Sequence, residues 1–270
     1  MELFTRGIRP PEVAPRAKCS VPLRRIVNWA HRGASGHAPE NTLAAFETAL
    51  ALGADGIECD IRESRDGALV IFHDATLKRV TGKPTRVDQL SLAQLQQVDL
   101  GSTFSRRFSG ATIPIPSEVI ARLPPPFRIN LEIKTPSVDS VVRLIQETAI
   151  LDRVLVSSFD HLLLEQMRRM HATLPIGVLV RRESWDAIIH VAARLNAISI
   201  HLPLKRVAPR WVAAIHGAGY QVHVYTVDAE GEMIRLMRMG VDGIFTNYPD
   251  RLNALQYSSE NIHPPIPSTL

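Results

Sequence analysis

Cysteine and aromatic residues are scarce in this chain. It has two cysteines among 270 residues, Cys19 and Cys59, and aromatic residues make up 6% of it. A disulfide framework is not expected at this size, and the two cysteines show no spacing typical of a metal site. We therefore expect two free thiols, which are typical of a reducing compartment.

Long apolar runs are absent as well. No window approaches the ~20 uninterrupted apolar residues of a transmembrane helix, so we expect no stable membrane insertion. The first 25 residues contain five arginines but no apolar segment of the kind a secretory signal needs. We predict a cytoplasmic protein whose residues 1–24 form a poorly ordered, proline-rich extension, with a cleaved organellar presequence as the alternative.

The chain carries no strong charge of one sign. Its formal net charge is +4, and the lysines and arginines form no block with interleaved aromatics, so nucleic acid is not an expected partner. Hydrophobic residues make up 45% and charged residues 21%, which is typical of a globular protein. The modest positive charge favours an anionic small molecule as substrate. Nothing in the composition indicates an oligomeric state.

From Arg25 onward, short β-branched runs alternate with helical patterns. This alternation predicts an α/β fold, a TIM (β/α)8 barrel over residues 25–255 that is followed by a C-terminal tail at 256–270. A doubly wound open sheet is the structural alternative. The predicted strands are 25–30, 56–61, 128–134, 154–159, 176–180, 197–202, 221–227 and 243–247. The predicted helices are 42–52, 138–149, 161–171, 185–195, 209–217 and 230–239.

One segment, at about residues 74–127, breaks the alternation. It is too long for a simple strand-to-helix connection, so we predict an insertion on the C-terminal face of the barrel after the second strand region. A capping box at 91–94 opens a short helix within it. Its apolar side chains either pack the insertion onto the barrel or line an apolar groove: Phe104, Phe108, Ile113 and Ile115.

Acidic residues occur two positions apart on a predicted strand. Glu58 and Asp60 therefore project to the same face, while Cys59 faces the outer helices. Glu132 and Lys134 repeat this spacing on the next core strand. Three carboxylates in one barrel mouth would repel one another unless a cation joins them, and an all-oxygen site favours Mg²⁺ or Ca²⁺. The alternative is a set of structural salt bridges.

Two histidines end strand-like runs near these acids. His31 ends the first predicted strand, and His73 ends the run ALVIFH. Imidazoles titrate near neutral pH, so two of them beside a metal could divide the roles of base and acid. Arg32 and Lys134 supply fixed positive charge that matches a pair of phosphate oxygens.

Other polar residues are weaker candidates for the pocket. His201, His223 and Tyr225 fall near strand ends and either line the pocket or pack beneath it. Glu40 lies near the site or favours a helix N-terminus, where Asn41 is the predicted N-cap. His37 lies mid-loop and is predicted to be a surface or rim residue.

Taken together, the motifs resemble those of the glycerophosphodiester phosphodiesterase family. They are HRG with PENT at 31–42, GIECDIRESRDGALVIFHD at 56–74, LEIK at 131–134 and GIFTNYP at 243–249. The likeness runs from about residue 26 to 250. It implies a TIM barrel that uses a divalent cation to hydrolyse glycerophosphodiesters to glycerol 3-phosphate and an alcohol.

The resemblance also implies roles for single residues. The metal ligands would be Glu58, Asp60 and Glu132, the acid/base pair His31 and His73, and the phosphate-binding residue Arg32. Lys134 matches the basic residue after the third acid, and Glu40 is the glutamate of PENT. The chain departs from the family at Tyr225-Thr226, where WT is common, and at Asn247, where an aspartate is common.

These observations predict a metal-dependent hydrolase of small glycerophosphodiesters. We expect His31 to act as the base and His73 as the acid, with attack by water or by a hydroxyl of the substrate. One alternative is a lysophospholipase D that acts on long-chain lysophospholipids and uses the insertion as an apolar groove. An alternative from another class is a non-catalytic barrel that binds phosphodiesters, but no expected acid or histidine is missing.

Overall fold

The computed structural model describes residues 24–134 and 137–260. Eight parallel strands in this part of the chain form a barrel, which β1 closes by pairing with both β2 and β9. They are β1 (Val27–His31), β2 (Gly56–Glu63), β4 (Arg128–Ile133), β5 (Val154–Ser158), β6 (Ile176–Leu179), β7 (Ser199–Pro203), β8 (Gln221–Tyr225) and β9 (Gly243–Thr246). This closure confirms the predicted TIM barrel and excludes the open sheet.

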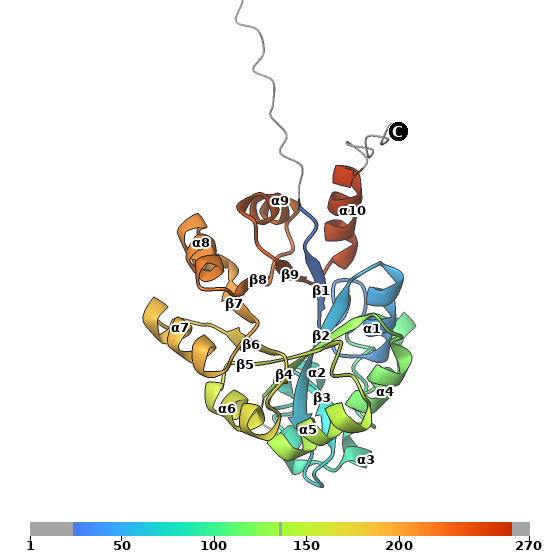
Figure 1. Cartoon of the computed structure of the whole chain (residues 1–270). Coiled ribbons are helices and arrows are strands. Elements are labelled where there is room, and N and C mark those ends of the chain that lie inside the picture. The colour runs from blue at the N-terminus through green and yellow to red at the C-terminus, as the bar shows by residue number, and fades with distance from the viewer. Residues whose placement is uncertain (1–23, 135–136, 261–270) are drawn as a thin grey trace, which may run out of the picture.

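Helices surround the strands as an outer ring (Figure 1). They are α1 (Leu43–Ala51), α4 (Pro116–Arg122), α5 (Val138–Glu147), α6 (His161–Met170), α7 (Trp185–Arg194), α8 (Pro209–Gly217), α9 (Glu230–Met239) and α10 (Pro249–Glu260). In α5 the buried residues Val138, Val141, Val142 and Ile145 follow the spacing of one helical face. Burial of such stripes against the strands stabilises the ring.

Along β2 the side chains alternate between the barrel interior and the outer core. Ile57, Cys59 and Ile61 are fully buried in the hydrophobic core that the helices share with the strands. Glu58 and Asp60, at the intervening positions, therefore point into the barrel. Cys59 is a free thiol, as predicted, whereas Cys19 lies outside the described residues.

The connection between β2 and β4 is longer than the others and forms the insertion. It contains β3 (Leu69–Ile71), which runs antiparallel to β2, and the short helices α2 (Lys78–Thr81) and α3 (Leu92–Leu95). Its own small hydrophobic core consists of Val70, Phe72, Leu77, Val87, Leu95, Leu100 and Ile113. Burial of Ile113 favours packing over a groove at that position, while Phe104 is 45% exposed.

The insertion ends earlier than the predicted residue 127. Residues 116–122 form α4, and its Val119 and Ile120 belong to the main barrel core. Pro116 occupies the first turn of this helix, where its missing N–H leaves no hydrogen bond unmade. α4 is therefore one of the outer barrel helices rather than a part of the insertion.

The last helix extends past the predicted boundary at residue 256. α10 runs to Glu260, and buried Gln256 accepts a hydrogen bond from the backbone N–H of Ile26 at 2.7 Å. The predicted tail therefore begins inside α10, because Gln256 ties this helix to the start of β1. Residues 1–23 and 261–270, where most of the two predicted terminal segments lie, are outside the described part. No helix in the described part is long and apolar enough to span a membrane.

Candidate active site

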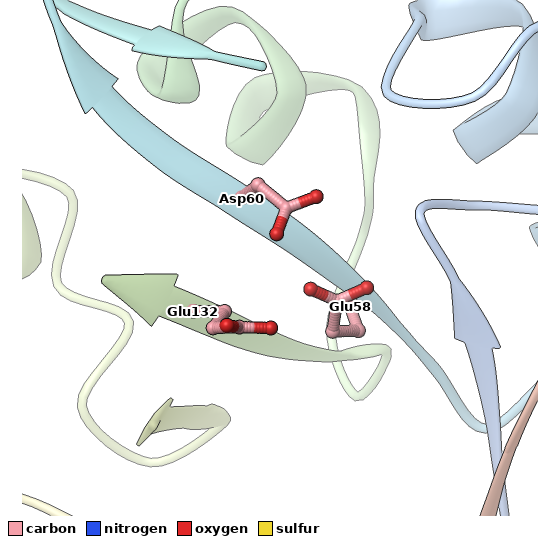
Figure 2. A group of neighbouring side chains, drawn as sticks. All are labelled: Glu58, Asp60 and Glu132. Atoms are coloured by element: carbon pink, nitrogen blue, oxygen red, sulfur yellow. The ribbon is translucent and has the colours of Figure 1, made fainter. Parts of the chain in front are cut away.

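Three carboxylates meet at the C-terminal end of the barrel. Glu58 and Asp60 extend from β2 and Glu132 from the neighbouring strand β4, and the three face a common space (Figure 2). One carboxylate oxygen from each lies within 4.8 Å of the others. The parallel register pairs Asp60 with Glu132, so the two strands hold these residues at the same height. The structure therefore brings together the three acids that the sequence singled out.

The three carboxylates are buried, and their pKa values are shifted in different directions. Burial raises the pKa of Glu58 well above its usual value, and the charges of Asp60 and Glu132 raise it further. Burial also raises the pKa of Glu132, again with a contribution from Asp60. Burial alone would raise the pKa of Asp60, but Lys134 and Arg32 outweigh it and lower that pKa to about 2.

The cluster fits a hard divalent cation. Oε1 of Glu58 is buried and has no hydrogen-bond partner among the described residues. The donor set is all oxygen, which suits Mg²⁺ or Ca²⁺ better than Zn²⁺. The single nearby ammonium, Lys134 Nζ, lies 3.0 Å from Asp60 Oδ1 and also contacts Glu132. Lys134 and the Arg32 guanidinium, 3.4 Å from Asp60, supply two positive charges against three carboxylates, and a cation would balance the excess negative charge.

A left-handed turn brings Arg32 into the site directly after β1. Arg32 has φ +56° and Gly33 has φ +79°, and a Cβ at Gly33 would lie 2.7 Å from Ala45. This turn lets the backbone N–H of Arg32 donate to Glu58 Oε2 at 2.9 Å. The guanidinium donates to Glu40 at 2.9 Å and lies 3.4 Å from Asp60 Oδ2. A strained backbone at this position thus serves the site.

His31 has a neutral partner that fixes its tautomer. The amide nitrogen of Asn247 donates to Asp228 Oδ2 at 2.7 Å, so Asn247 presents its oxygen to His31 Nδ1, 2.8 Å away. His31 must therefore carry its proton on Nδ1 and leave Nε2, which lies 4.0 Å from Glu58, as an acceptor. Burial and the charge of Arg32 lower the pKa of His31 to about 4.

His73 has a charged partner. Its Nδ1 lies 2.6 Å from Oδ1 of Asp74, and its remaining nitrogen is not engaged by any protein group in the described part. Burial and the charges of Arg32 and Lys134 lower the pKa of His73 below its usual value, and the carboxylates of Asp60 and Asp74 oppose that shift only in part. Arg79 of the insertion donates to Asp74 at 2.7 Å and, through both terminal nitrogens, to Glu40 at 2.7 and 2.9 Å.

The two histidines, Arg32 and two of the acids, Glu58 and Glu132, border one cavity of about 200 Å³. It is narrow, and its walls combine these polar groups with apolar side chains. The lining residues are His31, Arg32, Glu58, His73, Asn130, Glu132, Lys134, Phe159, Leu179, Tyr225, Thr226 and Phe245. The cavity therefore brings together all the predicted acid/base, metal and phosphate-binding residues except the more deeply buried Asp60.

Of the three weaker pocket candidates near the strand ends, one lines the cavity and two are buried below it. Tyr225 lines the cavity, and its hydroxyl donates to the carbonyl of Val180 at 2.5 Å. His201 and His223 are 0% and 2% exposed, stack on each other with centroids 5.1 Å apart, and are not among the lining residues. His223 and Tyr225 both point inward, but His223 is one layer further from the mouth.

Glu40 and His37 lie at the rim. Glu40 is outside the catalytic cavity but borders two shallower ones, and it holds Arg32 and Arg79 together. His37 Nε2 lies 2.8 Å from Asp250 Oδ1, a contact between the first loop and α10. His37 thus lies where a rim residue was predicted, whereas Glu40, a pocket candidate, lies beside the cavity rather than in its lining.

Sequence reasoning missed three polar residues that support the site. Asn41 is not the N-cap of α1, because Thr42 accepts from the Ala45 N–H instead. Asn41 is buried with φ +57°, and its side chain donates to Asp60 Oδ2 at 2.8 Å. Asn247 and Asp228 are the other two. Their nearness to His31 depends on the closing pair β1–β9, which no local pattern reveals.

The sequence is similar to those of known glycerophosphodiester phosphodiesterases. Residues 31–251 match the model of the glycerophosphoryl diester phosphodiesterase family. A glycerophosphodiester phosphodiesterase of Caldanaerobacter subterraneus is 36% identical over 233 residues, which cover 83% of this chain and 94% of that protein. One from Bacillus subtilis is 30% identical and covers 84% of this chain and 85% of its own length.

Solved structures agree with these relatives. An Oleispira antarctica phosphodiesterase in complex with the product sn-glycerol-3-phosphate superposes with a TM-score of 0.77 at 30% identity, covering 84% of this chain and 95% of that one. A glycerophosphodiester phosphodiesterase from Agrobacterium tumefaciens gives a TM-score of 0.77 at 28% identity, with coverages of 85% and 100%.

Proposed function

Because the chain belongs to the glycerophosphoryl diester phosphodiesterase family, we propose that it hydrolyses small glycerophosphodiesters to glycerol 3-phosphate and an alcohol with a divalent cation. The observation that carries this proposal is one cavity lined by two carboxylates, two histidines and an arginine, with the third carboxylate, Asp60, clustered with the other two. The Oleispira neighbour holds sn-glycerol-3-phosphate, a product of this kind of reaction. A cavity of about 200 Å³ suits a group the size of glycerol 3-phosphate better than a long acyl chain.

Glu58, Asp60 and Glu132 would hold the cation, Mg²⁺ or Ca²⁺. Bound there, a divalent cation supplies a Lewis acid that stabilises negative charge on a phosphoryl oxygen. The chain's own contribution is to fix the three carboxylates on rigid strands. Asn41 and the Arg32 N–H add hydrogen bonds to Asp60 and Glu58 that orient two of them.

Arg32 and Lys134 would bind the phosphate group from two sides. Both line the cavity, and both keep their positive charge, because neighbouring carboxylates raise the pKa of each against the opposing effect of burial. Fixed positive charge in a largely buried site stabilises a phosphoryl group as its charge grows in the transition state. Their ion pairs with Glu40 and Asp60 hold them in place before substrate arrives.

The partners of the two histidines support His31 as base and His73 as acid. His31 is neutral and offers Nε2 as an acceptor for the proton of the attacking hydroxyl, whether that belongs to water or to the glycerol group. His73 faces the carboxylate of Asp74, which stabilises the imidazolium form. A protonated His73 can then donate its Nε2 proton to the leaving alkoxide oxygen.

The proposal is tested by measuring release of glycerol 3-phosphate from glycerophosphocholine and glycerophosphoethanolamine in EDTA, Mg²⁺ and Ca²⁺. We expect no release in EDTA and recovery with at least one cation. Equal release in EDTA and in the cations would contradict the role given to the acids. Binding without turnover under every condition would support the non-catalytic barrel. Turnover only of lysolipids above their micelle concentration would support the lysophospholipase D alternative.

A further inference from the structure

A second cavity, of about 390 Å³, adjoins the catalytic one. The two share Glu132, Lys134 and Phe159 as lining residues, so the side chain of Phe159 lies where they meet. The second cavity continues along the loops that follow β5 and β6 and is more open. A phosphodiester has two arms, and only one of them fits the narrow catalytic cavity. The other arm has this adjoining space available.

Arg181 borders this second cavity and has no carboxylate partner among the described residues. Its guanidinium carbon lies 4.0 Å from the centre of the Phe159 ring. Glu183, the nearest acid in sequence, accepts from the backbone N–H groups of Arg181 and Arg182 at 2.6 and 2.9 Å. The loop carboxylate is thus held by backbone amides, and the guanidinium of Arg181 keeps its hydrogen-bonding capacity for a ligand.

The surroundings of Arg181 are basic. The loops after β6 and β7 carry Arg181, Arg182, Lys205 and Arg206 against the single carboxylate of Glu183. Arg206 donates to the carbonyls of Arg181 and Glu183 at 3.4 and 2.9 Å, so the two loops are joined. Asp160 on the loop after β5 adds a second anion at the cavity wall, so four cations and two anions leave a local charge of about +2, which attracts an anionic group to this rim.

The aromatic face in this cavity is not open to a cation. Phe159 has the Arg181 guanidinium over its ring, and Lys134 Nζ lies 5.9 Å from the ring centre. A quaternary ammonium would bind best to a free aromatic face with no competing positive charge. Phe159 offers neither condition, so this cavity disfavours a choline-like alcohol.

We propose that the second cavity binds the alcohol arm of the substrate and that Arg181 selects alcohols bearing a further anionic group, such as a phosphate monoester. This inference rests on the proposed function, which it extends from the reaction to the substrate class. A guanidinium pairs with a phosphate through two parallel hydrogen bonds, and its stacking on Phe159 fixes its orientation. Arg181 is then a specificity residue that acts on substrate binding.

The test compares glycerophosphoinositol 4-phosphate with glycerophosphoinositol, which differ only in the added phosphate, and with glycerophosphocholine. We expect the wild-type kcat/KM to be about tenfold or more higher for the phosphorylated diester, through KM. Arg181→Gln should remove most of that preference, because it should lower kcat/KM for the phosphorylated diester far more than for glycerophosphocholine. Arg181→Lys should restore only part of it. The matched control is Arg182→Gln, an exposed neighbour outside the cavity lining, which should retain the preference.

An equal preference in wild type and Arg181→Gln, or a wild-type preference for glycerophosphocholine, would overturn the inference. Hydrolysis of none of the three diesters would instead count against the proposed function. Calorimetric titration with glycerophosphoinositol 4-phosphate then decides on the subsite separately. Binding about tenfold weaker in Arg181→Gln supports it, and equal binding overturns it.

Discussion

The two sides of the barrel mouth use the same residue types for different purposes. On the side of β1 to β4, His31 and His73 each have an oxygen partner at Nδ1 and face the cavity. On the side of β7 and β8, His201 and His223 stack on each other beneath the cavity, and neither nitrogen of His223 has a hydrogen-bond partner among the described residues. A histidine near a strand end is therefore not by itself a sign of catalysis.

Charge compensation differs between the two sides as well. Arg32 and Arg79 are tied to Glu40, and Arg79 also to Asp74, so the first side is a closed network of ion pairs. Arg181, on the second side, stacks on Phe159 and has no carboxylate partner within residues 24–134 and 137–260. The ion pairs of the first side hold its groups in place before a substrate binds, whereas we propose that the charge of Arg181 serves a variable part of the substrate.

The largest effect should follow from removing a histidine of the first side. His31→Ala or His73→Ala should lower kcat by about 10²–10⁴, because each loses a proton acceptor or donor in the transition state. Steady-state kinetics at saturating cation measures this. The matched control is His37→Ala, a rim histidine outside the cavity lining, which should change kcat by less than about twofold. A loss below tenfold in both catalytic variants would contradict the acid/base roles.

A smaller effect is expected from replacing Asn41, whose side chain donates a hydrogen bond to Asp60. Its left-handed backbone is tolerated by glycine, so Asn41→Gly removes the hydrogen bond to Asp60 with little added strain. We expect the cation concentration for half-maximal activity to rise about 10–100-fold, with kcat recovered at saturation. Activity titrated against Mg²⁺ and Ca²⁺ measures the shift. An unchanged cation requirement would mean that Asp60 does not depend on this bond.

Asp74→Asn makes the partner of His73 a neutral amide, like that of His31. Loss of the carboxylate should lower the pKa of His73, and an acid must be protonated to act. The alkaline limb of the kcat/KM profile should therefore move to lower pH, by about one unit, with about tenfold lower activity above that limb. Asp250→Asn, which alters the His37 contact instead, is the control. If the alkaline limb of the kcat/KM profile stays at the same pH, Asp74 does not influence the proton transfer by His73.

The smallest effect on activity should come from replacing His223, which is buried and stacked on His201. Burial lowers the pKa of His223 to about 4. Between pH 6.5 and 4 the unfolded chain binds a proton at His223 that the folded chain does not. The contribution of His223 to the free energy of unfolding is therefore fully present above pH 6.5 and is lost as the pH falls to 4. This contribution amounts to about 3 kcal/mol. Denaturant unfolding across this range should show a weaker pH dependence in His223→Phe, with kcat near wild type at pH 7. An unchanged pH dependence would mean that His223 is not one of the titrating groups.

The local sequence pattern was sufficient to predict the barrel and the three acids that meet at its mouth. The spacing of Glu58 and Asp60 determines that both point inward, because a strand alternates its faces whatever it pairs with. The alternation of short apolar runs with helical segments likewise predicted all eight barrel strands close to their observed bounds. The exceptions, α4 and the end of α10, are short or weakly patterned segments whose role depends on what they pack against.

The sequence by itself determined which residues carry reactive groups and on which face of each strand they lie, since these depend only on residue type and on a period of two. Only the tertiary structure decided the partners of those groups. Closure of β1 onto β9 brings Asn247 to His31 across 216 positions and fixes its tautomer, and the fold of the insertion carries Arg79 to Glu40 across 39 positions. Such contacts depend on register and loop path. For the same reason, only the structure separated His223 from Tyr225, because depth within a barrel is set by how the strands stagger.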